Sequence, residues 1–499
     1  MLDQYDARLD PTFAEIPREV LVARLQAVLP AHALLLSNEA MAPYETDGLA
    51  AYRAMPAVVA RPETVEQVQA ILKVCHDLGV PVVARGAGTG LSGGALPFPG
   101  CVLLSLARFD KILAIDADNR LARVQPGVRN LAISQAVAPL GLFYAPDPSS
   151  QIACSIGGNV AENAGGVHCL KYGLTVHNIS RVELVTIEGE RLVFGGETLD
   201  APGLDLMALI TGSEGLLGVI TEVTVRLLPS PTLTRTMLAA FADVEAAAGA
   251  VAEIIATGVV PAGLEMMDGP ALRAAEAYVQ AGYPTDAAAI LLCELDGAEA
   301  DVAEDLARVQ QVCRDAGAIQ VRIAGDEAER MLFWAGRKGA FPALGRMSPD
   351  YYCIDGTIPR RSLPKVLAQI ARLGDDYGMV VANVFHAGDG NLHPIILYDA
   401  NVENGLENCE ALGGRILELC VEVGGSITGE HGVGREKINQ MCAQFATAEI
   451  ETFEAVKRAF DPAGLLNPGK AIPTLARCAE YGAMHVHGGK LPFAHIPRF

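Results

Sequence analysis

Hydrophobic and polar positions change their pattern twice along the chain. Residues 1–50 include the amphipathic segment REVLVARLQAVL, which predicts a helical N-terminal region. From residue 56 onward, short apolar runs bounded by Pro, Gly, Asp or Asn predict strands. The segment 64–79 predicts a helix that Thr64 caps and Gly79 ends. We therefore expect a mixed α/β domain over residues 51–230.

A second pattern begins after the Pro- and Thr-rich stretch at residues 230–236, which predicts a linker. Strand and helix patterns then alternate as far as a long helix over 404–424. This order is typical of antiparallel sheets covered by helices. We expect a second domain over residues 231–472 and a separate tail over residues 473–499. The predicted fold class for the whole chain is α+β.

The charge of the chain excludes several classes of protein. With 38 Lys and Arg against 59 Asp and Glu, the formal net charge is −21. Nucleic-acid binders and proteins that adhere to anionic lipid present basic faces instead. The apolar runs are too short for a membrane span, and the acidic N-terminus lacks the pattern of a secretory signal.

The 11 cysteines are scattered and form no C-x-x-C pair. This spacing favours reduced thiols in a cytoplasmic protein. It also argues against an iron–sulfur cluster or a structural zinc site built from cysteines.

Two glycine-rich segments lie in the predicted first domain. The stretch ARGAGTGLSGGA, residues 84–95, has five glycines between Gly86 and Gly94, and PDPSSQIACSIGGNVAENAGG repeats the theme at 146–166. Converging backbone N–H groups in such loops suit an anion, so two of them suggest a ligand with a long phosphate spine. A flexible surface loop is the alternative. The GTGLSG match does not predict a Rossmann fold, because Pro97 and Pro99 stand where its helix should run.

Two histidine-bearing turns lie in the predicted second domain. The motif HAGDGNLH places His386 and His393 on either side of a tight turn, and GGSITGEHGVGREK places Glu430 beside His431. Two histidines and one carboxylate with an open fourth position form a ligand set typical of catalytic zinc. Polar turns whose histidines cap backbone carbonyls are the alternative.

The glycine-rich segments resemble the FAD-binding domain of the vanillyl-alcohol-oxidase/para-cresol-methylhydroxylase superfamily. The resemblance implies that the first loop carries the FAD pyrophosphate and that the second lines the flavin. Some members attach FAD covalently through a histidine at the position of Thr89, so non-covalent FAD is implied here. The implied FAD-binding residues are Arg85, Gly86, Ala87, Gly88, Thr89, Gly90, Ser92, Gly93, Pro146, Ser150, Gly157, Gly158, Asn159, Asn163, Gly165, Gly166, Glu214, Gly215, Gly218, Ile220 and Asn467.

The histidine motifs resemble the substrate domain of the FAD-linked D-2-hydroxyacid dehydrogenases, which include D-lactate, D-2-hydroxyglutarate and glycolate dehydrogenases. The resemblance implies that His386, His393 and Glu430 hold a divalent metal, with zinc as the expected ion. It also implies that His431 is the catalytic base and that Arg337, a helical turn after Trp334, binds the substrate carboxylate.

The implied chemistry is coherent. A 2-hydroxyacid is oxidised when it loses its hydroxyl proton and the hydride on C2. The hydroxyl pKa lies far above 7, so a histidine alone is a poor base for it. A divalent ion on the hydroxyl oxygen stabilises the alkoxide, and the flavin accepts the hydride at N5.

The segments 334–361 and 475–499 resemble one branch of this family, the flavin subunits of bacterial glycolate oxidase. The resemblance implies a second flavoprotein-like subunit and an iron–sulfur subunit as partners, and a cytoplasmic protein that reaches the inner membrane only through them. We expect the tail over residues 473–499 to dock onto a partner, and ligand roles for its His485 and His487 are the alternative. Electrons would pass to these partners or to quinone, not to NAD. Cys353 and Ile354 stand where hydroxyglutarate-type members carry a lysine, which favours a small substrate such as glycolate.

Three alternatives stay open from the sequence alone. The first is a D-lactate dehydrogenase of the same fold. The second is a metal-independent flavin oxidase of alcohols, whose histidines are purely structural. The third is a flavin-binding subunit that has no catalytic activity until it is assembled.

Overall fold

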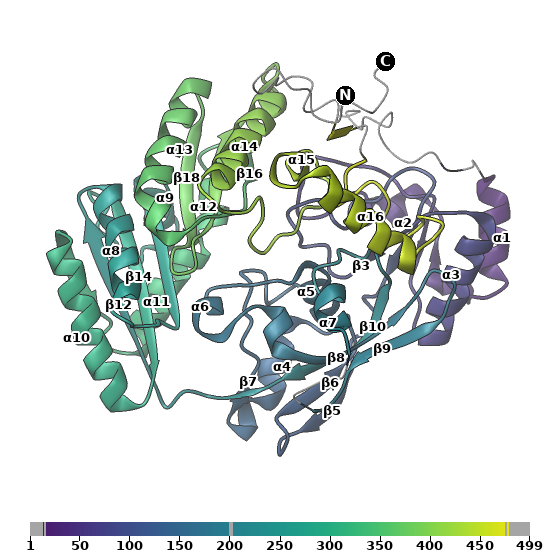
Figure 1. Cartoon of the computed structure of the whole chain (residues 1–499), viewed down its shortest axis with the longest axis horizontal. Helices are drawn as coiled ribbons and strands as arrows, with labels where there is room; N and C mark the ends of the chain where they lie inside the picture. Colours follow the sequence, from purple (N-terminus) through teal and green to yellow (C-terminus); the bar gives the residue numbers. More distant parts are fainter. Residues whose placement is uncertain (1–12, 14–15, 199–202, 475–476, 479–499) are drawn as a thin grey trace.

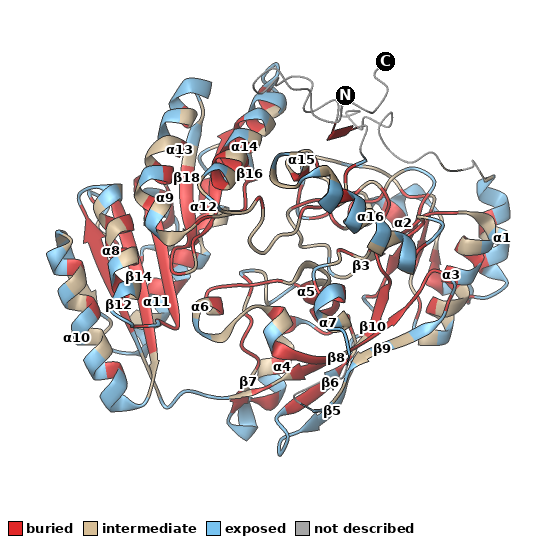
Figure 2. Ribbon diagram, in the orientation of Figure 1, coloured by how far each residue is buried: buried red, intermediate tan, exposed pale blue. Residues whose placement is uncertain are grey.

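The computed structural model describes residues 13, 16–198, 203–474 and 477–478. Two halves face each other, the N-terminal half in purple and blue and the C-terminal half in green (Figure 1). Buried strands lie inside each half, and the helices around them expose their outer faces (Figure 2). The predicted tail docking falls almost entirely on residues outside the described part.

The first sheet of the N-terminal half has the order β1-β2-β4-β3. Its strands are β1 (Leu34–Leu35), β2 (Val58–Ala60), β3 (Val82–Arg85) and β4 (Val102–Ser105). Helix α1 (Arg18–Gln26) packs on α3 (Val65–Leu78), which Thr64 caps and Gly79 ends in the left-handed conformation, as predicted. The predicted helical N-terminal region contains α1 and, in addition, the two-residue strand β1, which pairs antiparallel with β2 at the edge of this sheet.

The second sheet of the N-terminal half is antiparallel, in the order β5-β6-β10-β8-β9. Its strands are β5 (Ile112–Asp116), β6 (Leu121–Val124), β8 (Ile179–Val185), β9 (Arg191–Gly195) and β10 (Val219–Arg226). A separate pair joins β7 (Leu142–Phe143) to β11 (Leu228–Pro229). The α-helices of this region are α2 (Asn38–Met41), α4 (Asn130–Val137), α5 (Ile156–Glu162), α6 (Cys169–Tyr172) and α7 (Leu206–Ile210).

The C-terminal half is built on one large antiparallel sheet, as the sequence pattern predicts. Its strands are β12 (Leu233–Phe241), β13 (Gly263–Asp268), β14 (Ala289–Gly297), β15 (Ala318–Ile323), β16 (Asp350–Cys353), β17 (Gly356–Thr357), β18 (Val380–His386), β19 (Asn391–Leu392) and β20 (Pro394–Tyr398). Because β12 begins at Leu233, the predicted linker shrinks to residues 230–232.

Helices cover both faces of this sheet. The helices that pack on its strands are α8 (Val244–Ala256), α9 (Gly269–Val279), α10 (Glu299–Asp315), α11 (Glu327–Lys338), α13 (Leu363–Tyr377) and α14 (Gly405–Glu422). Helix α12 (Ala340–Leu344) packs on α9, α15 (Met441–Gln444) packs on α14, and α16 (Thr447–Phe460) follows in the chain. Short 3-10 helices are η2 (Ala31–Ala33), η3 (Ala42–Tyr44), η4 (Ala138–Leu140), η5 (Thr175–Asn178) and η6 (Arg360–Ser362).

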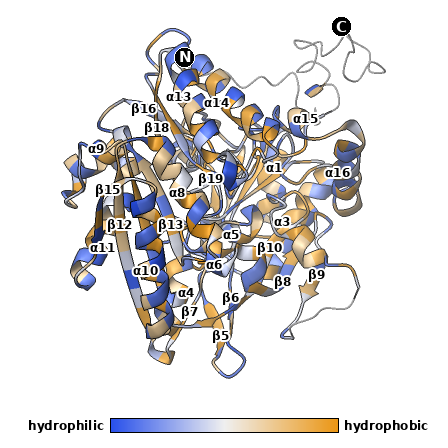
Figure 3. Ribbon diagram, turned by 60° about the vertical axis from the view of Figure 1, so that its left-hand side comes forward, coloured by the Kyte–Doolittle hydropathy of each residue, from blue (hydrophilic) through white to orange (hydrophobic). Residues whose placement is uncertain are grey.

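The sequence of strand β14 is almost continuously apolar, because the strand is buried on both faces. Leu291 and Cys293 point into one core cluster, and Ile290 and Leu292 point into another on the opposite face. Successive side chains of a strand alternate between faces, so a strand buried on both sides has no polar face to show. Figure 3 shows the hydrophilic residues, in blue, on helix α10, which lies outside this sheet.

The chain returns to the N-terminal half after the large sheet is complete. Leu466 forms a parallel bridge with Val82, and the N–H of Asn467 donates to the Val82 carbonyl at 2.8 Å. Lys457 on α16 donates to the carbonyl of Leu216 at 2.7 Å. In Figure 1, α16 accordingly lies over the N-terminal half. The last part of the predicted second domain therefore completes the first one.

A disulfide joins Cys442 to Cys478, across a sequence separation of 36 residues. This corrects the expectation that all thiols are free. The expectation came from the absence of cysteines close together in the sequence. Spacing in the sequence cannot reveal a disulfide between segments that only the fold brings together. The other nine cysteines are free and buried. Among the described residues, no helix has the length and apolar character needed to cross a bilayer.

Candidate active site

A cavity lies between the two halves of the chain. The N-terminal half supplies most of its wall, and the C-terminal half contributes Phe341, His393, Glu430 and His431. The residues of the N-terminal half that the sequence predicts there and that line it are Arg85, Gly86, Ala87, Gly88, Thr89, Gly90, Ser150, Gly157, Gly158, Asn159, Glu214, Gly215, Gly218 and Ile220. The two glycine-rich segments and the two histidine motifs thus meet in one place.

The first glycine-rich loop follows β3 directly and presents its backbone to the cavity. Within the described part of the chain, none of the N–H groups of residues 86–91 donates a hydrogen bond. Gly88 has a φ of +71°, a conformation in which a Cβ is strained. Consecutive free N–H groups at a cavity wall form a concavity that attracts anions. This arrangement fits the predicted phosphate-binding loop.

The second glycine-rich segment begins a helix, where the sequence reading expected a second anion-binding loop. Ser155 caps α5 and accepts a hydrogen bond from the Gly158 N–H. A Cβ on Gly157 would lie only 2.5 Å from the Pro126 Cβ, so glycine is needed for this close packing. The helix turns its first residues toward the cavity, so the segment still lines it.

Seven other residues implied for FAD binding do not line this cavity, and their role toward FAD stays a prediction: Ser92, Gly93, Pro146, Asn163, Gly165, Gly166 and Asn467. They support the wall from behind. The Asn467 amide donates to the carbonyls of Gly94 and Glu214, and the Asn163 side chain accepts from the Val176 N–H. These two side-chain amides hold the loops together.

His386, His393 and Glu430 converge as their spacing predicts. His386 ends β18, and His393 follows β19 after the turn. The Glu430 Oε1 lies 3.1 Å from the His386 Nε2 and 3.4 Å from the His393 Nε2. The His393 Nε2 is buried and has no hydrogen-bond partner. A buried nitrogen without a partner, facing a carboxylate, fits a site made for a cation.

Charges around this group keep Glu430 ionised. Burial alone would raise the pKa of Glu430, but His386 beside it lowers that pKa to about 2. His386 in turn lies between two carboxylates, so its pKa is raised well above the usual value despite burial. Glu430 is therefore available as an anionic ligand over the whole physiological range of pH.

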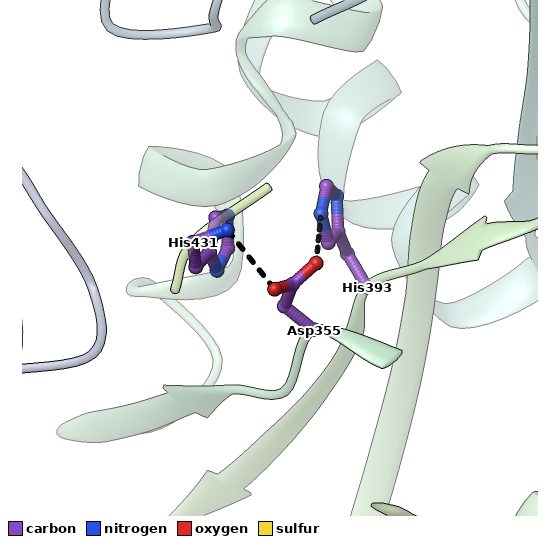
Figure 4. Close-up of side chains that lie close together, drawn as sticks. All are labelled: Asp355, His393 and His431. Atoms are coloured by element: carbon purple, nitrogen blue, oxygen red, sulfur yellow. Dashed lines mark hydrogen bonds and ion pairs between the residues drawn. The ribbon is translucent and has the colours of Figure 1, made fainter. Parts of the chain in front are cut away.

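Asp355, which the sequence analysis did not single out, lies under the second histidine motif (Figure 4). Its carboxylate accepts hydrogen bonds from three successive backbone N–H groups, those of residues 429–431. It also pairs with the buried Lys437 ammonium at 2.9 Å. Asp355 thus holds the turn that presents Glu430 and His431.

Asp355, His393 and His431 form a second group that could geometrically hold a metal. The ammonium of Lys437 and three N–H groups already satisfy the Asp355 carboxylate. A cation placed there would face the Lys437 charge directly. The group made of His386, His393 and Glu430 is therefore the better site for a cation.

His431 lies at the cavity wall with its ring stacked on that of His393, 4.8 Å between centroids. Its Nδ1 is buried and has no hydrogen-bond partner. Burial lowers the pKa of His431 to about 4, although Asp355 opposes this shift. The imidazole is consequently neutral at physiological pH and able to accept a proton.

Arg337 does not line the cavity. Its side chain is 2% exposed, and its Nε and Nη2 lie 2.8 and 2.7 Å from the Oε2 of Glu265 on β13. The sequence pattern did not predict β13, because the run GLEMMD does not alternate regularly between apolar and polar residues. The acidic Glu265 inside this mostly apolar run was the available sign.

The N-terminal half fastens the turn that carries His431. Glu214 accepts hydrogen bonds from the N–H groups of Val433 and Gly434 at 2.7 and 2.6 Å. The hydroxyl of Ser92 donates to the His431 carbonyl at 2.8 Å. Both halves must therefore be docked for the site to be complete.

A second contact between the halves centres on His168. Its Nδ1 lies 2.8 Å from Asp147 and its Nε2 lies 3.2 Å from Glu294 on β14. Glu294 also accepts hydrogen bonds from Arg330 and from the Trp334 indole. Burial alone would lower the pKa of His168, but Asp147 and Glu294 raise it to about 10.

This contact makes stability depend on pH. The folded pKa of His168 lies above the unfolded value near 6.5, so its contribution is complete below that pH and is lost as the pH rises toward about 10. We expect this loss to amount to roughly 2–4 kcal/mol. Thermal unfolding of the wild type and of His168→Gln between pH 6 and pH 10 measures it. Parallel curves for the two proteins would contradict the prediction.

The amino-acid sequence matches two known protein families. Residues 56–195 match the family "FAD binding domain", and residues 230–471 match "FAD linked oxidases, C-terminal domain". The glycolate oxidase subunit GlcD of Escherichia coli (strain K12) is 65% identical over 495 residues, covering 99% of both chains. GlcD of Bacillus subtilis (strain 168) is 39% identical over 442 residues, covering 88% of this chain and 94% of that one.

The chain is also similar to a more distant relative and to a solved structure. A D-lactate dehydrogenase of Anaerostipes hadrus is 31% identical over 461 residues, covering 90% of this chain and 96% of that one. The structure of p-cresol methylhydroxylase with substrate bound has a TM-score of 0.77 at 19% identity, covering 92% of this chain and 97% of that one, which shows a shared fold. With an FAD-binding domain joined to an FAD-linked oxidase domain, and with relatives along its whole length, the chain is an FAD-linked oxidoreductase and belongs to the FAD-linked D-2-hydroxyacid dehydrogenase family.

Proposed function

We propose that the chain oxidises glycolate to glyoxylate, with FAD as the immediate oxidant and a divalent metal ion as a second cofactor. The observation that supports this most is the convergence of His386, His393 and Glu430 beside the neutral His431 at one cavity. The naming of a relative at 65% identity as a glycolate oxidase subunit supports the choice of substrate.

The metal would be held by His386, His393 and Glu430. The unpartnered His393 Nε2 and the ionised Glu430 support this ligand set. Two imidazole nitrogens and one carboxylate oxygen, with a fourth position free, suit zinc. The free position would receive the substrate hydroxyl.

The side chains would act in the following way. His431, neutral and at the cavity wall, takes the hydroxyl proton of the substrate. Arg337 is proposed to bind the substrate carboxylate, as in the family, although in this structure its guanidinium is paired with Glu265. When bound, the metal stabilises negative charge on the hydroxyl oxygen and FAD accepts the two electrons with the C2 hydrogen.

FAD would bind without a covalent link, because no side chain able to form one stands at Thr89 in the first loop. The free N–H groups of residues 86–91 are proposed to bind its pyrophosphate. The residues lining the rest of the cavity, from Ser150 to Asn159 and from Glu214 to Ile220, would face the ribityl chain and the flavin ring.

Electrons would leave through partner subunits, to quinone and not to NAD. The sequence has no cysteine pair with the spacing of an iron–sulfur ligand set, so one-electron relay needs another protein. We propose a second flavoprotein-like subunit and an iron–sulfur subunit as partners. The word "subunit" in the names of the GlcD relatives supports a complex.

D-lactate oxidation is the second candidate, favoured by the relatives named D-lactate dehydrogenase at 31 and 33% identity. Anaerobic flavin reduction with a panel of 2-hydroxyacids separates the two. We expect fast bleaching of the flavin absorbance with glycolate, and stoichiometric metal in the same sample. Bleaching with D-lactate but not with glycolate would refute the proposed substrate, and full activity after stringent chelation would refute the metal role.

A further inference from the structure

Glu265 occupies a fully internal position behind the proposed metal site. Its side chain is 1% exposed, and the two oxygens have different partners. Oε1 lies 2.7 Å from the His386 Nδ1, and Oε2 lies 2.8 Å from the Arg337 Nε. The three side chains form a chain of contacts that ends at the proposed ligand, and neither Glu265 nor Arg337 lines the cavity.

The register of the sheet produces this contact. Glu265 on β13 and His386 on β18 are direct partners across an antiparallel pair. Side chains of such partners project from the same face and approach closely. Glu265 therefore meets the Nδ1 of His386, while the Nε2 of the same ring lies 3.1 Å from Glu430.

We propose that Glu265 is a positioning residue for the metal ligand His386, and that Arg337 balances the charge of Glu265 so that the carboxylate can stay buried and ionised. This inference rests on the metal role proposed above. The Glu265 oxygen accepts the hydrogen on Nδ1, which keeps the Nε2 lone pair directed at the ion. A carboxylate behind a ligating histidine also makes that histidine a stronger donor.

Arg337 compensates the buried charge of Glu265. A buried carboxylate without a cation costs several kcal/mol, and the Arg337 guanidinium, which donates from Nε and has its Nη2 2.7 Å from the same oxygen, offsets this cost. Arg337 thus has a function in holding Glu265 whether or not one of its N–H groups also reaches the substrate.

The variant Glu265→Gln tests the proposal through metal binding, independently of activity. We expect its affinity for Zn²⁺ to fall by about 10- to 100-fold in competition with a coloured chelator, with FAD content unchanged. Glu265→Asp is a second variant in case the first does not fold. It keeps a negative charge beside Arg337, but its carboxylate is one methylene too short to hold the Nδ1, so it should also bind Zn²⁺ more weakly.

Glu294→Gln is the matched control. Glu294 lies on the neighbouring strand β14, is also buried, and likewise contacts a histidine and an arginine, namely His168 and Arg330. We expect this variant to lose stability but to keep its Zn²⁺ affinity. Unchanged affinity in both Glu265 variants, or equal losses in Glu265→Gln and Glu294→Gln, would overturn the inference. A wild type that binds no Zn²⁺ would instead overturn the proposed metal role itself.

Discussion

Replacing His386 with alanine is expected to slow flavin reduction by glycolate at least about a thousandfold, while FAD stays bound. A metal ion contributes several kcal/mol to the stabilisation of developing negative charge, and each 1.36 kcal/mol corresponds to a factor of ten in rate. His386 offers its Nε2 to the same point as Glu430 and His393. It does not line the cavity proposed for FAD, so the cofactor loses no contact.

Stopped-flow spectroscopy under anaerobic conditions measures this rate, and elemental analysis measures the metal in the same sample. His76→Ala is a suitable control, because His76 lies near the end of α3, away from the cavity wall. Loss of FAD from His386→Ala would give this histidine a structural role. Normal reduction with no bound metal would remove the metal from the mechanism.

Replacing His431 with asparagine is expected to lower the rate of flavin reduction by about 10²- to 10⁴-fold, the usual contribution of a general base. The backbone of residue 431, not its side chain, holds the turn, because its N–H donates to Asp355 and its carbonyl accepts from Ser92. The variant should therefore keep the fold, the FAD and the metal. Binding of Zn²⁺ and FAD at wild-type levels together with slow reduction would match this expectation.

Two outcomes would contradict this role. Reduction at the wild-type rate would show that another group takes the proton. Loss of metal together with activity would show that His431 is a ligand, as in the group that contains Asp355 and His393. The rate of flavin reduction and the amount of bound metal, measured for the variants at His386 and His431, thus distinguish a metal ligand from a catalytic base.

The sequence predicted those parts of the site whose chemistry is carried by residues close together in the chain. The glycines of residues 84–95 determine a loop with free N–H groups, because glycine permits a backbone that other residues adopt only with strain. The turn in HAGDGNLH brings His386 and His393 together, because a tight turn between antiparallel strands needs only local residues. Thr64 and Gly79 bound α3 for the same local reason.

Only the tertiary structure decided which distant side chains complete the site. Glu265 reaches His386 through the register of β13 on β18, and Asp355 reaches residues 429–431 through a contact between segments more than 70 residues apart. Arg337 pairs with Glu265 inside the protein, a contact that the sequence motif did not indicate. The return of residues 465–467 to β3 and the disulfide from Cys442 to Cys478 arise in the same way.

The difference between the features that the sequence predicts and those that only the fold decides has a physical reason. Turns, caps and glycine loops depend on backbone preferences that act over a few residues, so the amino-acid sequence of this protein determines them directly. The partner of a buried charge depends on which strands and helices pack together, and in this chain that packing joins residues far apart in the sequence. The sequence by itself thus determined the glycine-rich loops and the histidine-bearing turns, and the folded sheet decided what holds them in place.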